Sequence, residues 1–131
     1  MAPDPIPPTI VEFVRRTFES VRQLELLLML RAEPSRAWTA TEMSVELRSS
    51  ETGTANHLAD LQVKGLLARH DGPDGAAAYR YAPDQAVERT VSALAEVFGR
   101  RKQSVVRLIF SEPEENPIQT FADAFRIRRD G

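Results

Sequence analysis

One stretch, HLADLQVKGLLAR from His57 to Arg69, constrains the fold more than any other part of the chain. Leu58 and Leu61 are three residues apart, so on a helix they share one face and can hold it against a core. Gly65 follows about one turn later, and glycine tolerates the left-handed backbone that often ends a helix. The next residues, LLARH, are typical of a short strand. The stretch therefore predicts a helix that turns directly into a β-strand.

A shorter helix is expected just before this one. In TATEMSVELRSS either Thr39 or Thr41 can cap this helix. We expect its single apolar side to consist of Met43, Val45 and Leu47. Ser50, or Ser49, can then cap the next helix, which is expected to span residues 50–64. Two short helices joined by a tight polar turn predict a helix-turn-helix.

A β-hairpin is predicted after the second helix. LLARH and AAAYRYAP are strand candidates, and DGPDG between them is dense in turn-forming residues. We expect the hairpin to cover residues 67–81.

The N-terminal flank divides into a tail and helical sequence. Residues 1–8 are rich in proline and predict an extended or disordered tail, followed by a domain over residues 9–83. A helix is expected from about residue 10, with Thr9 as its N-cap and Glu12 completing a capping box. Ser20 and Gln23 can form a second capping box or lie within one long helix that ends before Pro34.

Residues 84–131 predict a C-terminal helical segment for dimerisation or partner binding. Asp84 can cap a long helix, which Gly99 weakens, so that a break there is possible. A last short helix is expected near residues 118–131. The long segment has more apolar positions than a small core needs, which favours a homodimer. The residues predicted to form the dimer are Val91, Leu94, Phe98, Val105, Ile109 and Phe110.

Composition excludes several classes of protein. The chain has 131 residues, a hydrophobic share of 42%, a net charge of −2 and no cysteine, which indicates one soluble domain without disulfides or cysteine-ligated metals. It shows no membrane-spanning run, secretory signal, metal-ligand spacing or nucleophile motif. We therefore expect a cytoplasmic protein that is not an enzyme and needs no cofactor or metal. Trp38 can line an effector pocket, but a core position is the commoner role.

The order of these elements, helix, helix-turn-helix, hairpin and long C-terminal helix, resembles the winged-helix transcription regulators of the bacterial MarR and PadR groups. The residues that carry the resemblance are in HLADLQVKGLLAR, and it covers roughly residues 20–83. It implies a mainly α fold with a small β-hairpin, the wing, and flanking N-terminal and C-terminal helices. It also implies that the helix at 50–64 enters the major groove of double-stranded DNA and that the wing contacts the backbone.

The resemblance implies a set of DNA-binding residues. Asn56 is the best candidate for reading a base edge, because its amide can pair twice with adenine. The predicted set is Arg48, Ser50, Thr52, Thr54, Asn56, His57, Lys64, Arg69 and Arg80. From Arg36 to Arg80 the chain has five basic residues (36, 48, 64, 69, 80) and six acidic ones (42, 46, 51, 60, 71, 74), so phosphate contacts are expected to be few.

This charge balance keeps a second function open. A winged-helix module with weak or no DNA binding can instead dock on another protein and modulate another regulator. The acidic hairpin tip and the front of the helix, which begins with Glu51, favour this alternative.

Overall fold

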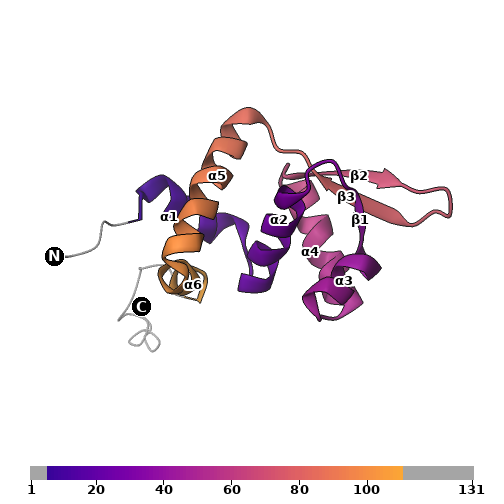
Figure 1. The fold of residues 1–131 in the computed structure, drawn as a ribbon, viewed down its shortest axis with the longest axis horizontal. Helices are drawn as coiled ribbons and strands as arrows, with labels where there is room; N and C mark the ends of the chain where they lie inside the picture. Colours follow the sequence, from indigo (N-terminus) through magenta and orange to yellow (C-terminus); the bar gives the residue numbers. More distant parts are fainter. Residues whose placement is uncertain (1–5, 111–131) are drawn as a thin grey trace, which may run out of the picture.

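The computed structural model describes residues 6–110, which form nine elements in one continuous core. Their order is α1 (Pro8–Thr17), α2 (Val21–Ala32), β1 (Trp38–Thr39), α3 (Ala40–Leu47), α4 (Glu51–Val63), β2 (Leu67–Asp71), β3 (Ala77–Tyr81), α5 (Gln85–Arg100) and α6 (Lys102–Phe110). In Figure 1, α1, α5 and α6 gather at one end and the β2–β3 hairpin projects from the other. The predicted mainly α fold with a small hairpin is confirmed.

The start of the chain differs in detail from the prediction. α1 begins at Pro8 with Pro7 as N-cap and no side-chain cap, so the capping box predicted at Thr9 is wrong. Proline at the first helical position explains the earlier start, because its backbone is already set for a helix. α2 is a separate helix capped by Ser20, whose hydroxyl accepts a hydrogen bond from the Gln23 N–H.

α3 corrects the predicted apolar face. Met43 and Leu47 are buried, but Val45 is 71% exposed. Residues two apart on a helix point to different faces, whereas residues four apart share one. Met43 and Leu47 therefore contact the core and Val45 faces away from it.

The sheet has three antiparallel strands in the order β1-β3-β2. β2 and β3 form the predicted hairpin, with Leu67 opposite Tyr81 and Asp71 opposite Ala77. β1 pairs Trp38 with Tyr79, an edge strand that sequence analysis did not predict, because two residues carry no periodic signal. Trp38 is buried in the core.

The C-terminal helical sequence is interrupted. Asp84 caps α5 as predicted, and α5 ends at Arg100, two residues before α6 begins at Lys102. α6 contacts both α1 and α5, which also contact each other. The last helix predicted near residues 118–131 lies outside the described residues, as do residues 1–5 of the predicted tail. No helix within residues 6–110 is long and apolar enough to cross a membrane.

Candidate nucleic-acid interface

The turn between α3 and α4 is built from local hydrogen bonds. At the start of α3, Thr39 and Glu42 form a full capping box. At its end, Arg48 adopts the left-handed conformation with φ 54°, and the N–H of Ser49 donates to the Ser44 carbonyl at 3.0 Å. Ser50 then caps α4 by accepting from the Gly53 N–H at 3.0 Å. This geometry is the predicted helix-turn-helix.

α4 has two opposite faces. Leu58 and Leu61 are fully buried, as predicted, and Gly65 ends the helical segment with φ 87°. The positions on the outer face repeat at intervals of four, three and four residues, which places them on one stripe of a helix. This outer stripe consists of Thr52, Asn56, Ala59 and Val63, all of them exposed.

Two predicted DNA-binding residues at the front of α4 have structural roles. Thr54 is 2% exposed, and its hydroxyl lies 3.2 Å from that of Ser49, so its prediction as a groove contact is wrong. It precedes Leu58 by four residues and therefore shares the buried face. The Ser50 hydroxyl is used in capping, although Ser50 itself is exposed.

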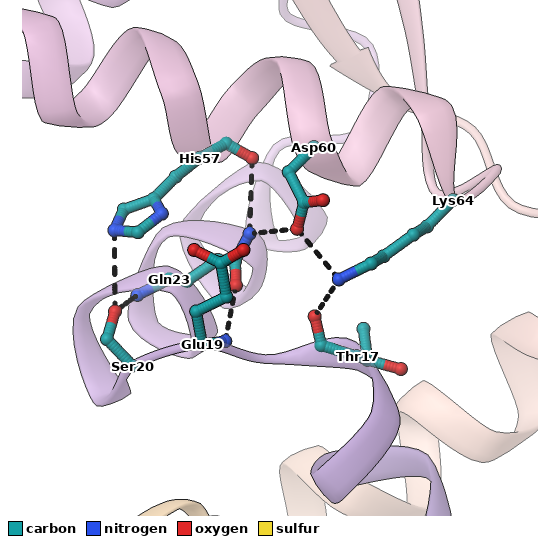
Figure 2. A network of polar contacts seen from close by, with 7 residues as sticks. All are labelled: Thr17, Glu19, Ser20, Gln23, His57, Asp60 and Lys64. Carbon is teal, nitrogen blue, oxygen red and sulfur yellow. Dashed lines mark hydrogen bonds and ion pairs between the residues drawn. The ribbon is translucent and has the colours of Figure 1, made fainter.

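A polar network fastens the inner side of α4 to α1 and α2 (Figure 2). Its centre is Gln23, a fully buried residue of α2. The Gln23 amide nitrogen donates to Asp60 Oδ2 at 2.9 Å and to the His57 carbonyl at 3.3 Å. Its amide oxygen accepts from the Glu19 N–H at 2.8 Å. These bonds hold α4 at a set rotation about its own axis.

His57 and Lys64 belong to this network rather than to the outer stripe. His57 Nε2 lies 3.4 Å from the Ser20 hydroxyl. Lys64 Nζ donates to the Thr17 carbonyl at 2.7 Å and to Asp60 Oδ2 at 2.8 Å (Figure 2). Both side chains therefore make contacts within the chain, while Lys64 stays exposed and His57 half-buried.

The charge of Asp60 is stabilised by the same network. Burial alone raises the pKa of this carboxyl, but hydrogen bonds from Lys64 and Gln23 outweigh burial, and its pKa lies below the ordinary value. Asp60 is therefore ionised at neutral pH and neutralises Lys64 locally.

The hairpin carries both basic and acidic groups. Arg69 forms an ion pair with Asp71 at 3.2 Å, and Arg80 Nη1 lies 3.3 Å from His70 Nε2. At the tip, Gly75 has φ 84°, and Asp74 accepts from the Ala76 N–H at 3.0 Å. The two predicted wing arginines thus lie on the hairpin, and Arg69 is partly neutralised by Asp71.

A second cluster joins the base of the hairpin to α5. Arg31 of α2 contacts both carboxylate oxygens of Glu88, at 3.1 and 3.4 Å, and the Tyr81 hydroxyl donates to the same carboxylate. The hydrogen bond from Tyr81 and those from Arg31 lower the pKa of Glu88. Burial, reinforced by Glu88, raises the pKa of Tyr81, which keeps its proton. This cluster of Arg31, Tyr81 and Glu88, called the clasp below, connects α2, β3 and α5.

We predict that the clasp contributes to acid sensitivity. A carboxyl whose pKa is lowered by folding stabilises the fold above its unfolded pKa of about 4.3, and that stabilisation is lost as the pH falls through the folded pKa. Glu88→Gln should therefore reduce the loss of unfolding free energy between pH 6 and pH 3, measured by urea denaturation. Glu96→Gln, at an exposed position of α5, is the matched control. Equal acid dependence in the Glu88 variant and wild type would contradict the role of the clasp.

The residues predicted to form a dimer divide into two groups. Val91, Leu94 and Val105 are fully buried within one chain, because α1, α5 and α6 cover one another, so these three are corrected to core residues. Phe98 and Ile109 are partly buried, and Phe110 is 73% exposed. Only the second group still offers surface to a partner.

No model of a protein family and no curated protein matches this chain. Several solved structures share its fold. A Staphylococcus aureus MepR–DNA complex has a TM-score of 0.54 at 17% identity, covering 73% of this chain and 78% of that one. A homodimeric winged helix-turn-helix DNA-binding domain, Mb0332 from Mycobacterium bovis, described as a possible ArsR-family regulator, gives 0.53 at 19%, covering 77% and 93%. The transcriptional regulator Tm0710 from Thermotoga maritima gives 0.53 at 14%, covering 88% and 80%. These similarities show that the predicted winged-helix fold is correct.

Proposed function

We propose that the protein is a dimeric winged-helix transcription regulator that reads double-stranded DNA with α4 and contacts the flanking backbone with the β2–β3 hairpin. The observation that carries the proposal is the outer stripe of α4, an exposed face on a helix that the Gln23 network fixes from beneath. Preorganised side chains on a rigid helix suit recognition of base edges in the major groove. Such a protein would act in the cytoplasm without cofactor or metal.

The contacts expected with DNA are fewer than the residue types alone suggest. Asn56 and Thr52 are exposed on the outer stripe, while Arg48 is exposed at the turn before α4. Arg69 and Arg80 lie on the hairpin, where we expect them to contact phosphates rather than base edges. Because these expected contacts include only three cations, Arg48, Arg69 and Arg80, the affinity for DNA should fall less steeply with salt than it does for proteins with many phosphate contacts.

Binding to DNA itself is tested by fluorescence anisotropy with sheared genomic DNA at low and moderate salt. We expect binding at low salt that weakens with added salt. Absence of binding at low salt would leave the alternative, a winged-helix protein-interaction module. The hairpin supports this alternative, since its tip carries Asp71 and Asp74 and its Arg69 is already paired.

Asn56→Ala should reduce discrimination between specific and random DNA more than it reduces salt dependence. The amide can form two hydrogen bonds with adenine, and a bidentate pair contributes about 1–3 kcal/mol of discrimination. Competition titrations with both kinds of DNA measure the ratio. Gln103→Ala removes an exposed amide on α6 and is the matched control. An equal loss on specific and random DNA would contradict base reading by Asn56.

We expect a dimer to form through the exposed end of α6, with Ile109 and Phe110 of α6 and Phe98 of α5 at the contact. Light scattering after size exclusion should give a dimer at micromolar concentration, and Phe110→Asp should weaken it at least tenfold, as expected for a buried aromatic anchor. Val45→Asp, at an equally exposed valine on α3, should leave the dimer intact. A wild-type monomer across micromolar concentrations would refute the dimer.

A further inference from the structure

Arg48, at the turn between α3 and α4, has a backbone conformation that arginine rarely adopts. With φ 54° and ψ 48°, it is the only residue other than glycine with a positive φ among residues 6–110. The left-handed region crowds the β-carbon of an L-residue against the backbone, and glycine and asparagine occupy it most readily. Arginine at this position therefore makes the folded chain less stable than glycine would.

The turn itself requires a left-handed residue here. The Ser49 N–H donates to the Ser44 carbonyl at 3.0 Å, five residues back. The Arg48 N–H donates to the Val45 carbonyl at 3.3 Å. Hydrogen bonds of this kind close the end of a helix whose next residue is left-handed. Since Ser50 is already the N-cap of α4, the short connection fixes the backbone at residue 48 and leaves only its side chain open to choice.

The side chain of Arg48 has no partner in the described fold. It is exposed, and its guanidinium forms no hydrogen bond, ion pair or ring contact with any of residues 6–110. The other four basic residues between positions 36 and 80 each have one: Arg36 contacts Glu33, Lys64 contacts Asp60, Arg69 contacts Asp71, and Arg80 lies beside His70. No contact within residues 6–110 therefore offsets the strain at Arg48.

Arg48 is also the main source of positive charge on the helix-turn-helix. Residues 40–63, which cover α3, the turn and α4, contain one arginine and no lysine. The same stretch contains four carboxylates, those of Glu42, Glu46, Glu51 and Asp60. Carboxylates repel DNA phosphates, whereas an arginine attracts them. Arg48 precedes the front of α4, where Thr52 and Asn56 are exposed, so it can hold a phosphate next to the residues expected to read bases.

We infer that the Arg48 guanidinium holds one DNA phosphate at the front of α4. This inference rests on the proposed DNA-binding function and assigns the phosphate contact on which the helix-turn-helix depends. Arginine suits this role because its planar guanidinium can donate two parallel hydrogen bonds to a phosphate. Backbone strain is typically retained where function requires it. Stability and DNA affinity therefore oppose each other at residue 48.

The first test is Arg48→Gly, which removes the strain and the charge together. We expect its unfolding equilibrium constant, measured by urea denaturation, to fall about fivefold, which corresponds to about 1 kcal/mol. Its affinity for DNA should fall roughly tenfold at about 0.1 M salt, which is the contribution of one phosphate contact. Because the variant should be more stable than wild type, misfolding cannot explain weaker binding.

Arg48→Gln removes the charge and keeps a side chain in the strained position. The slope of log affinity against log salt should become shallower by about 0.9. Affinity should fall equally on specific and random DNA, because a phosphate contact carries no sequence information. Arg48→Lys keeps the cation and should retain the wild-type slope. Arg89→Gln makes the same chemical change at an exposed arginine of α5 and should leave both affinity and slope unchanged.

The outcomes separate this inference from the proposed function. If wild type binds DNA and Arg48→Gln shows the same affinity and salt slope as Arg89→Gln, the inference is overturned and the proposed function stands. An Arg48→Gly variant that is less stable than wild type would overturn the strain on which the inference is built. Failure of the wild-type protein to bind any DNA at low salt would overturn the proposed function, and the inference with it.

Discussion

Replacing Gln23 with leucine should lower the free energy of unfolding by about 2–4 kcal/mol, because the change removes a buried amide that three partners use. Gln23 is fully buried and bonds to Asp60, the His57 carbonyl and the Glu19 N–H. Leucine fills similar space, so packing is largely retained. A buried polar group that loses its partner costs about 1–3 kcal/mol, and more where it is charged. Asp60 is the charged partner, although Lys64 still contacts it.

Urea denaturation followed by circular dichroism measures this effect. Gln103→Leu, at an exposed position on α6, is the matched control and should change stability by less than about 0.5 kcal/mol. A Gln23 variant as stable as this control would show that the network does not hold α4 in place. If the Gln23 variant folds but α4 rotates, its affinity for DNA should fall by more than the loss of folded protein at 25 °C explains.

Leu61→Ala should destabilise the fold by about 3 kcal/mol. Leu61 is fully buried on the inner face of α4, and its carbonyl accepts the Leu66 N–H at 3.0 Å where the chain turns into β2. Truncation of a buried leucine to alanine costs about 2–5 kcal/mol, since a cavity remains where the methyl groups were. Thermal and urea denaturation measure the loss.

Val63→Ala provides the matched control for Leu61→Ala, two residues further along the chain. Val63 is 81% exposed, so its truncation removes little buried surface. Its effect should stay within about 0.5 kcal/mol. Similar losses for both variants would contradict the assignment of inner and outer faces on α4, and with it the outer stripe.

Much of the scaffold could be predicted because its signals are local. Leu58 and Leu61 indicate the buried face, Gly65 ends the helical segment with a positive φ, and Ser50 and Asp84 cap α4 and α5 as expected. Each of these features depends on neighbours within about one helical turn.

Among the predicted DNA contacts, Thr54 is buried, and the sequence pattern already indicates this position. Thr54 lies four residues before Leu58, so the buried stripe itself indicates that Thr54 faces inward. The stripe opposite, which contains Asn56 and Val63, follows from the same periodicity. Position on the helix, rather than residue type, therefore decides which side chains of α4 are exposed.

For His57 and Lys64, no sequence pattern indicated the contacts that they make within the chain. Their partners, Ser20 and the Thr17 carbonyl, lie more than thirty residues away, and no spacing along the chain indicates that they meet. The burial of Val91 and Val105 also could not be predicted from the sequence. α6 turns back to contact α1, and this packing buries residues that would be exposed on one straight helix.

By itself the sequence determined the order of helices, the helix-turn-helix and the hairpin, since helical periodicity, capping and turn chemistry act between near neighbours. Only the tertiary structure decided which polar side chains of α4 face outward. The reason is that Gln23 and Asp60, separated by 37 residues, are paired by the packing of α2 against α4. That pairing sets the rotation of α4, turns His57 and Lys64 towards their partners Ser20 and Thr17, and leaves Asn56 and Val63 exposed on the opposite side.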